Sequence, residues 1–364
     1  MKYLFLASTP LQLLSAYIIA NSIHEQDENH LLLLGREEHT WNRCFSLRKM
    51  STDTFTWQKI IIMNNWLGRK SSLATLPTEI GSMKKMLRSI NPDHIFLGSD
   101  KTTQNQFLVE LANKSSFYRM EDGIWSYSSP DRIFLSKLWQ ATRMKIFRSI
   151  AKVKPLLKFN YEGVGRGSSC TADYLFKPFL LERPSPRVVT IEREYIQKAM
   201  KKLSAMGGEQ YSILSKNRLL LFLGSVWVER KKIPLRQELA LIKEIYQLSR
   251  QNGLKLLYKP HPSEQKTKLR YYKEHLPDIE FLTIADPIEY IYFMHPNIQA
   301  VMAHSSSGLL YADLFGNSQV KTIALLGLYG QRQTDPTLRR ILQKAGTHFP
   351  LNTTELSTII SSCP

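Results

Sequence analysis

Residues 1–20 read MKYLFLASTPLQLLSAYIIA, and this stretch decides the fold class. The apolar run Tyr3–Ala7 has the length of a strand, and Ser8-Thr9-Pro10 interrupts it. Apolar residues then recur with helical spacing from Leu11 to Ile18, which predicts a helix directly after the strand. A secretory signal peptide is the alternative for an apolar N-terminus with one lysine. We do not expect one, because no small-residue cleavage site precedes a polar mature start.

Short apolar runs and amphipathic stretches alternate in the same way along the rest of the chain. Strands of this kind, separated by helices, predict parallel sheets covered by helices, so the fold class is α/β. The expected strands are Tyr3–Ala7, Leu31–Leu34, Lys59–Met63, His94–Gly98, Leu219–Leu223, Lys255–Tyr258, Ile279–Phe281, Ala300–Ala303 and Thr322–Leu326. The expected helices include Leu11–Ser22, Ile80–Ile90, Gln104–Asn113, Ile191–Ser204, Arg236–Asn252 and Leu309–Phe315.

Length and proline content divide this chain into two domains. A single hydrophobic core stops growing at about 250–300 residues, and this chain has 364. The alternation weakens between residues 125 and 185 and then restarts. Pro184 and Pro186 lie in the break Glu182–Pro186, where neither a helix nor a central strand continues. We expect one domain over residues 1–180 and a second over residues 181–364, facing each other across a cleft.

Composition excludes several classes of protein. Hydrophobic residues make up 43% and aromatic residues 10%, which is enough for packed cores and excludes a disordered chain. Cys44, Cys170 and Cys363 are far apart, which excludes a disulfide framework and a paired-cysteine zinc site and favours a reducing compartment. No segment has the ~18 uninterrupted apolar residues of a membrane span, so we expect a cytoplasmic protein.

A basic segment over residues 132–158 stands out even in a chain with a net charge of +18. It contains no acidic residue, and its apolar residues recur at roughly helical spacing. A basic amphipathic helix lies on an anionic membrane or binds a polyanion, and the alternative is a solvated helix with one face in the core. The eight cations are Arg132, Lys137, Arg143, Lys145, Arg148, Lys152, Lys154 and Lys158.

Two adjacent carboxylates precede a glycine at Glu121-Asp122-Gly123. A loop at the end of a strand would present them to a cleft, and Gly123 would allow a tight turn there. One carboxylate would then act as a general base, with a pKa adjusted by its neighbour and by burial. Taken alone, such a triplet is more commonly an ordinary acidic turn.

The stretch Leu256–Pro262 is more specific, because an apolar strand runs into a loop that contains Pro260 and Pro262. These prolines favour extended backbone at Lys259 and His261, and residues two apart in an extended chain point the same way. A lysine beside an imidazole suits a phosphate, since one neutralises its charge and the other donates a hydrogen bond or a proton. The alternative for a lone loop histidine is a surface residue without a role.

Three further features in the second half of the chain suit a nucleotide. The serines Ser305–Ser307 follow an apolar strand and open a helix, where free backbone N–H groups bind anions; a plain serine cap is the alternative. Glu289 would accept hydrogen bonds from a ribose diol, although compensation of the helix dipole is its commoner role. Gly224 and Ser225, after an apolar strand, would let the backbone approach a nucleotide closely.

The sequence lacks the familiar nucleotide and metal motifs. It has no GxxxxGK[ST] loop, no GxGxxG after the first strand and no Asp-x-Asp element of metal-dependent nucleotide-sugar transferases. We therefore expect lysine, histidine and serine groups to neutralise the phosphate without magnesium. No metal site and no cofactor are expected.

Taken in order along the chain, these motifs resemble those of the bacterial sialyltransferases and polysialyltransferases. That group carries an acid–acid–Gly motif, a later His-Pro motif and a still later paired Ser/Thr motif. The resemblance implies a GT-B fold of two Rossmann-like domains, CMP-activated sialic acid as donor, metal independence and inversion at the anomeric carbon. The matching residues are Glu121-Asp122-Gly123, His261-Pro262, two of Ser305, Ser306 and Ser307, and the opening Ser8-Thr9-Pro10-Leu11-Gln12.

The resemblance also implies roles for individual residues. Asp122 is expected to be the general base that deprotonates the acceptor hydroxyl, with Glu121 as the second choice. His261 would contact the donor phosphate and assist the departure of CMP, and Glu289 would bind the ribose. With the residues singled out above, the expected donor-binding set is Lys259, Pro262, Glu289, Ser305, Ser306, Ser307, Gly224 and Ser225.

Several substrates and partners stay open at this point. The positive charge favours an anionic glycan acceptor such as a capsular polysialic acid, contacted by Arg143, Lys145 and Arg148. Another CMP-activated 2-keto sugar (Kdo, legionaminic or pseudaminic acid) is the alternative donor, because the motifs recognise CMP. A GT-B-shaped epimerase or hydrolase and a non-catalytic polyanion-binding protein are the competing classes. Contact with capsule machinery and the inner face of the bacterial cytoplasmic membrane is a further alternative, and no nucleic acid partner is expected.

Overall fold

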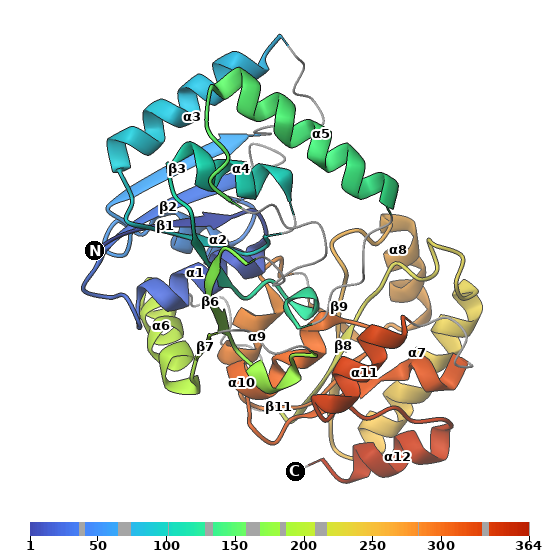
Figure 1. Ribbon diagram of the computed structural model, residues 1–364. Coiled ribbons are helices and arrows are strands. Elements are labelled where there is room, and N and C mark those ends of the chain that lie inside the picture. Colours follow the sequence, from blue (N-terminus) through green and yellow to red (C-terminus); the bar gives the residue numbers. More distant parts are fainter. Residues whose placement is uncertain are drawn as a thin grey trace. The chain divides into compact units, whose positions relative to one another are not determined.

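Each of the two units of this chain is built on a sheet whose strands all run parallel (Figure 1). The units are Met1–Met206 and Gly207–Pro364. The computed structural model describes residues 1–35, 41–64, 74–100, 102–127, 134–157, 168–182, 187–207, 217–282, 284–329 and 335–363, and within them the side chains of all but residues 64, 134–137 and 329.

The first unit has a seven-stranded sheet. Its strands are β1 (Lys2–Ala7), β2 (Glu28–Gly35), β3 (Lys59–Asn64), β4 (His94–Leu97), β5 (Phe117–Met120), β6 (Cys170–Leu175) and β7 (Val188–Thr190). The order is β3-β2-β1-β4-β5-β6-β7, and Phe5 of the central strand lies beside Leu31 on one side and Phe96 on the other. This is a Rossmann order, in which ligands bind beyond the carboxyl ends of the strands where the order reverses, here between β1 and β4.

Helices cover both faces of this sheet (Figure 1). They are α1 (Pro10–Ala20), α2 (Phe45–Thr52), α3 (Leu76–Ile90), α4 (Thr103–Leu111), α5 (Phe134–Ala151) and α6 (Arg193–Ala205), with short 3₁₀ helices η1 (Ile124–Ser126) and η2 (Pro178–Leu180). Leu4 and Leu6 of β1 pack into one core with α3, α4 and α5. Phe5 faces the other side, where it stacks on Phe96 and meets the edge of Trp57. There α1, α2 and α6 pack against one another.

The second unit repeats this plan with a five-stranded sheet. Its strands are β8 (Leu219–Leu223), β9 (Lys255–Lys259), β10 (Glu280–Phe281), β11 (Ile298–Ala303) and β12 (Lys321–Ala324). Its helices are α7 (Leu235–Gln251), α8 (Lys266–His275), α9 (Ile288–Met294), α10 (Ala312–Phe315), α11 (Pro336–Lys344) and α12 (Thr353–Ser361), with η4 (Ser307–Leu310) and η5 (Leu325–Tyr329). The order β10-β9-β8-β11-β12 reverses between β8 and β11, so the loops after these two strands flank the expected ligand position.

The sequence located most of these elements but not the division between the units. All nine expected strands coincide with strands of the structure, whereas β5, β6 and β7 were not expected. Because β7 pairs with β6 and α6 packs on α1, the first unit extends to Met206 instead of ending at residue 180. Of the expected break, residues 183–186 lie outside the described residues. The expected helix Leu309–Phe315 is divided between η4 and α10.

A buried ion pair joins β5 to β6. The Nε atom of Arg119 lies 2.5 Å from an Oδ1 oxygen of Asp173, and both side chains are only 1% exposed. The same guanidinium also donates to the carbonyl oxygen of Ser126, at 3.3 Å. The pair therefore fixes the strand that ends just before the acid–acid–glycine turn.

We expect Arg119→Met to lower the free energy of unfolding by about 3–5 kcal/mol, because it leaves the Asp173 carboxylate buried without its partner. Adding Asp173→Leu should restore most of the loss, since the second change removes that charge. Urea unfolding at pH 7 measures both variants. An exposed ion pair contributes about 0–1 kcal/mol to stability. If Arg119→Met alone lowered the free energy of unfolding by no more than that, the structural role of this ion pair would be contradicted.

Candidate active site

Asp122 follows β5 at the carboxyl edge of the first sheet. Its backbone N–H donates to Oγ of Ser126 at 2.8 Å, which closes the turn onto η1. Gly123, the next residue, has a φ of +88°, a conformation that L side chains rarely adopt. The turn therefore requires its glycine, and it leaves the Asp122 side chain half-buried.

Gln12, in the first turn of α1, holds the Asp122 carboxylate in place. Its Nε2 donates to Oδ1 of Asp122 at 2.7 Å. Its Oε1 accepts from both the backbone N–H and the hydroxyl of Ser8, at 2.8 and 2.9 Å. Because the two Ser8 donors fix which end of the amide carries the oxygen, the nitrogen faces Asp122. The sequence showed Gln12 within the Ser8–Gln12 motif but suggested no role for it.

Gly98, directly after β4, makes room for this amide. A Cβ atom at Gly98 would lie 2.4 Å from both Cδ and Nε2 of Gln12, far inside van der Waals contact. The loops after β1, β4 and β5 therefore meet at the point where the strand order reverses. Three separate parts of the sequence thus converge on one carboxylate.

The surroundings of Asp122 give it the pKa of a working base. Burial is the largest influence and raises the pKa to about 6, while the Gln12 amide, the Arg119 charge and the Thr9 hydroxyl act in the opposite direction. A carboxyl group with this pKa is mostly ionised at neutral pH and accepts a proton more readily than an ordinary aspartate.

Glu121 has a different environment from its neighbour. Its side chain is fully buried and accepts hydrogen bonds from the Tyr127 hydroxyl and from the backbone N–H groups of Gly123 and Phe176, the last two at 3.1 and 3.3 Å. Burial raises the pKa of Glu121. These contacts tie the turn after β5 to the end of β6, so Glu121 supports the turn.

His261, in the loop between β9 and α8, is exposed and has a fixed ring orientation. Its Nδ1 accepts from the backbone N–H of Ser263 at 3.1 Å, which leaves the Nε2 proton for a ligand. Partial loss of hydration and the nearby Arg230 charge lower the pKa of His261. Lys259 is half-buried and donates to the carbonyl oxygen of Ile284 at 3.2 Å. That Lys259 and His261 face one ligand stays a prediction, as does a role for the exposed Pro262.

The serine cluster follows β11. Ser306 caps η4 by accepting from the backbone N–H of Gly308 at 3.1 Å, while Ser305 is half-buried and Ser307 is exposed. The helix behind these serines is a single 3₁₀ turn, which offers a weaker dipole than the continuous helix expected from the sequence. Ser306 is thus occupied as a cap, and Ser305 and Ser307 remain as the candidate pair.

Glu289 lies in the first turn of α9 and is only 7% exposed. Burial is the dominant influence and raises its pKa to about 7, although the charge of Lys259 opposes this. A ribose diol is bound best by the ionised carboxylate, which accepts two hydrogen bonds. With this pKa Glu289 is about half ionised at neutral pH, and its role in binding a ribose stays a prediction.

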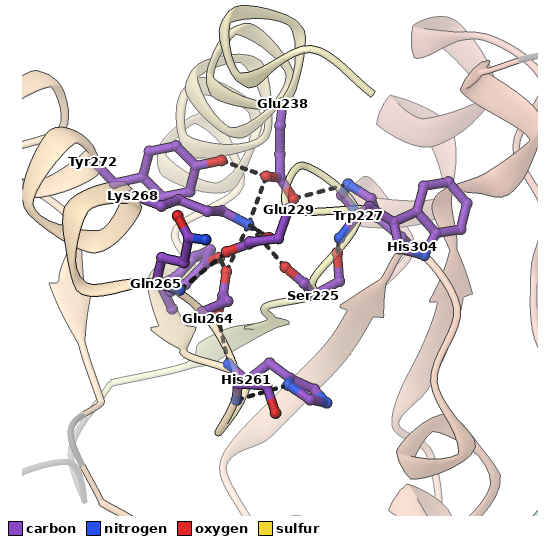
Figure 2. A network of polar contacts seen from close by, with 12 residues as sticks. Ser225, Trp227, Glu229, Glu238, His261, Glu264, Gln265, Lys268, Tyr272 and His304 are labelled. Carbon is purple, nitrogen blue, oxygen red and sulfur yellow. Dashed lines mark hydrogen bonds and ion pairs between the residues drawn. The ribbon is translucent and has the colours of Figure 1, made fainter. Parts of the chain in front are cut away.

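In the loop after β8, Gly224 and Ser225 make contacts that the sequence did not predict. A Cβ atom at Gly224 would lie 2.3 Å from Oε2 of Glu264, so this glycine makes room for a glutamate of the neighbouring loop. Ser225 is buried, and its carbonyl oxygen accepts from Nζ of Lys268 at 2.8 Å (Figure 2). Sequence analysis did not single out Lys268, which lies in the highly charged helix α8, or Glu264, which lies just before it.

The three expected acceptor residues on α5 have different surroundings. Arg148 makes two hydrogen bonds to the buried Glu110 of α4, at 2.5 and 2.8 Å. Its guanidinium holds α5 to α4, and its expected role in acceptor binding stays a prediction. Arg143 lies 4.7 Å above the ring of Trp139, and Lys145 is exposed. Of the remaining basic residues, Arg132 and Lys158 lie outside the described residues.

Two further features of the described part of the chain concern metals and membranes. No group of three or more His, Cys, Asp or Glu side chains there is placed to hold a metal ion. None of its helices combines the length and apolarity needed to cross a bilayer.

We expect the two adjacent acids to differ in their effect on stability. Glu121→Gln should lower the free energy of unfolding by about 1–3 kcal/mol, because an amide nitrogen would then face a hydrogen-bond donor in the interior. Asp122→Asn should leave stability unchanged or raise it at pH 7. The folded pKa of about 6 lies above the value of an unfolded aspartate, so the ionised side chain opposes folding above that pH. Thermal unfolding at pH 7 compares them, and equal losses in both variants would contradict this distinction.

Comparison with solved structures places the fold among known proteins. The UDP-GlcNAc 2-epimerase from Methanocaldococcus jannaschii has 11% sequence identity and a TM-score of 0.58, over 100% of this chain and 92% of that one. The corresponding enzyme from Neisseria meningitidis, bound to UDP-GlcNAc, has 13% identity and a TM-score of 0.56, over 99% and 89%. At this identity the likeness shows the fold alone, and the fold is GT-B. No curated protein matches the sequence.

The sequence also matches a family over most of its length. Residues 3–325 match the family described as "Alpha-2,8-polysialyltransferase (POLYST)". The matched region contains the acid pair of the first unit and the His-Pro and serine motifs of the second. The chain is therefore a glycosyltransferase and belongs to the alpha-2,8-polysialyltransferase family.

Proposed function

We propose that this chain is a metal-independent, inverting sialyltransferase that transfers sialic acid from CMP-sialic acid to a growing polysialic acid of a capsular polysaccharide. One observation carries the proposal: the Asp122 carboxylate is half-buried, is oriented by Gln12 and has a pKa of about 6. Membership of the polysialyltransferase family supports the class of donor and acceptor.

In the proposed reaction, Asp122 takes the proton of the acceptor hydroxyl while that oxygen attacks the anomeric carbon of the donor. The bond from this carbon to the phosphate oxygen of CMP breaks on the opposite face, so the configuration inverts. The proton ends on Asp122 and the electron pair of the broken bond on CMP. Gln12 keeps the carboxylate oriented through the hydrogen bond to Oδ1.

The departing phosphate is the proposed ligand of the second unit. His261 is neutral at pH 7 because its pKa is lowered, so it donates a hydrogen bond from Nε2 as negative charge develops on the phosphate. Lys259 supplies positive charge and Ser305 and Ser307 supply hydroxyl donors. Glu289 binds the ribose in its ionised form.

One assay distinguishes the proposed reaction from other reactions that the same fold could carry out. Donors carrying Kdo, legionaminic acid or pseudaminic acid share CMP and would use the same phosphate loops. The epimerase structures support only the fold, and their substrate carries UDP. Release of CMP from CMP-sialic acid, with an oligosialic acid lengthened by one residue, is the expected result. CMP release from another sugar donor alone, or turnover of UDP-GlcNAc, would contradict the proposal.

Asp122→Asn should reduce transfer by about 10²–10⁴-fold, as expected for loss of a general base, while CMP binding stays nearly intact. The rate of the unsubstituted enzyme should fall as pH is lowered through about 6, because protonation of Asp122 removes the base. Residual activity of the variant should lack that limb.

Chelation with EDTA should leave the rate unchanged. A variant with the unsubstituted rate, or an enzyme silenced by EDTA and rescued by magnesium, would contradict this mechanism.

Helix α5 presents a face that is both apolar and basic. Leu138, Trp139 and Ile146 are 56%, 60% and 39% exposed, and Lys145 lies exposed beside them along the helix. Arg143 stacks on the Trp139 ring. An anionic glycan accounts for the cations and for an indole that stacks on a sugar ring, whereas an anionic membrane surface accounts for the exposed Leu138 and Ile146 as well. We therefore propose that α5 rests on an anionic bilayer.

Replacing Trp139 and Ile146 together by glutamine should weaken binding to vesicles that contain anionic phospholipid by about tenfold or more, because each large apolar side chain contributes about 1.5–3 kcal/mol when buried. Transfer to a soluble oligosialic acid should be unchanged, which serves as the control. Sedimentation with vesicles measures the binding. Equal binding of the variant and the unsubstituted chain would contradict this surface.

A further inference from the structure

A buried lysine in the second unit is surrounded by acceptors from several elements (Figure 2). Lys268 of α8 is 4% exposed, and its ammonium group contacts three oxygens within hydrogen-bond distance. They are Oε2 of Glu238 at 2.8 Å, Oε1 of Glu264 at 2.7 Å and the carbonyl oxygen of Ser225 at 2.8 Å. Three contacts saturate the three protons of an ammonium group. A third carboxylate, that of Glu229, lies farther away at 3.7 Å.

Glu264 connects this lysine to the loop of His261. Its Oε2 accepts from the backbone N–H of His261 at 2.5 Å, and its own backbone N–H donates to the His261 carbonyl oxygen at 2.9 Å. Its Oε1 also accepts from the Tyr258 hydroxyl at 2.6 Å. The absence of a Cβ atom at Gly224 lets this carboxylate approach, as described above. Both main-chain groups of His261 are therefore held by one residue that Lys268 holds in turn.

Glu238 connects the same lysine to the loop after β11. Its Oε1 lies 3.1 Å from Nε2 of the fully buried His304, which directly precedes the serine cluster. The Tyr272 hydroxyl donates to its Oε2. The three contacts of Lys268 therefore reach the loops after β8, β9 and β11, through Ser225, His261 and His304 respectively.

We propose that Lys268 is a positioning residue, which fixes these three loops in the conformation that binds the phosphate of the CMP-activated donor. It lies beneath the loops and touches no substrate. The inference rests on the proposed function, because it assigns the phosphate to these loops. It adds the buried residues that place His261 and the Ser225 backbone relative to each other.

The composition of the network argues for positioning over stability alone. One ammonium group faces two close carboxylates and a third at longer range, and well-packed apolar side chains of similar size are often at least as stabilising as a buried ion pair. What apolar side chains cannot do is hold a backbone N–H and a backbone carbonyl of separate loops at fixed positions. A buried ammonium group whose three protons all have acceptors specifies one arrangement of those loops.

The test measures the dissociation constant of CMP, the Michaelis constants of donor and acceptor, and the melting temperature. Lys268→Met should raise the dissociation constant of CMP and the Michaelis constant of the donor by about tenfold to 10²-fold, because misplaced contacts weaken a binding site strongly. The acceptor constant should stay unchanged. Glu264→Gln, which cannot accept through both side-chain positions, is the second and milder variant and should show the same pattern.

Two controls separate positioning from loss of stability. Lys266→Met makes the same change on an exposed residue of the same helix and should alter nothing. Ile245→Ala opens the core of the second unit about two turns of α7 beyond Glu238, and it should lower the melting temperature without changing CMP binding. A conservative Lys268→Arg variant should recover part of the affinity, because guanidinium keeps the charge and several donors.

A double-mutant cycle tests the route of the effect. Glu264 is proposed to act by placing the His261 imidazole. Glu264→Gln should therefore reduce CMP affinity little further once His261→Ala has removed that imidazole, so the two effects are not additive. Unchanged CMP affinity in Lys268→Met, or a loss matched by Ile245→Ala at equal melting temperature, would overturn the positioning role while leaving the proposed function standing. An unsubstituted chain that binds no CMP would overturn both.

Discussion

Every strand of both sheets runs parallel to its neighbours, and this constraint determines where the chemistry of the chain lies. Parallel strands deliver all of their carboxyl ends to one edge, so loops from distant parts of the sequence meet there. In the first unit that edge gathers Ser8, Gly98 and Asp122 around one amide, Gln12. In the second unit it gathers the loops of Ser225, His261 and His304 around Lys268.

Both units use glycine and burial in the same way. Gly98 and Gly224 each leave the space that a Cβ atom would fill, and a polar side chain from another loop enters it. Burial also raises the pKa of one carboxyl group in each unit, that of Asp122 to about 6 and that of Glu289 to about 7. The carboxyl group of Asp122 therefore titrates closer to neutral pH than an ordinary aspartate does.

The sequence predicted the strands that contain an apolar run and missed β5 and β6, which carry buried charges, and the three-residue strand β7. Strand β5 contains Arg119 and β6 contains Asp173, so neither reads as a buried strand, although the two charges neutralise each other across the sheet. The sequence alone does not reveal this pairing across the sheet. The boundary between the units was therefore predicted too early in the chain. The motif residues Asp122 and His261 stand out in the sequence because each belongs to a short local motif. Lys268 was not, because its partners come from three loops.

The chain belongs to the alpha-2,8-polysialyltransferase family, and the proposal that Asp122 is its base is tested by the pH dependence of one variant pair. The rate of transfer from CMP-sialic acid should rise with pH along a limb centred near 6 in the unsubstituted enzyme. Asp122→Asn should lose both the limb and most of the rate, while Glu121→Gln keeps the limb. A limb that persists in Asp122→Asn and disappears in Glu121→Gln would assign the base to Glu121 and contradict the account.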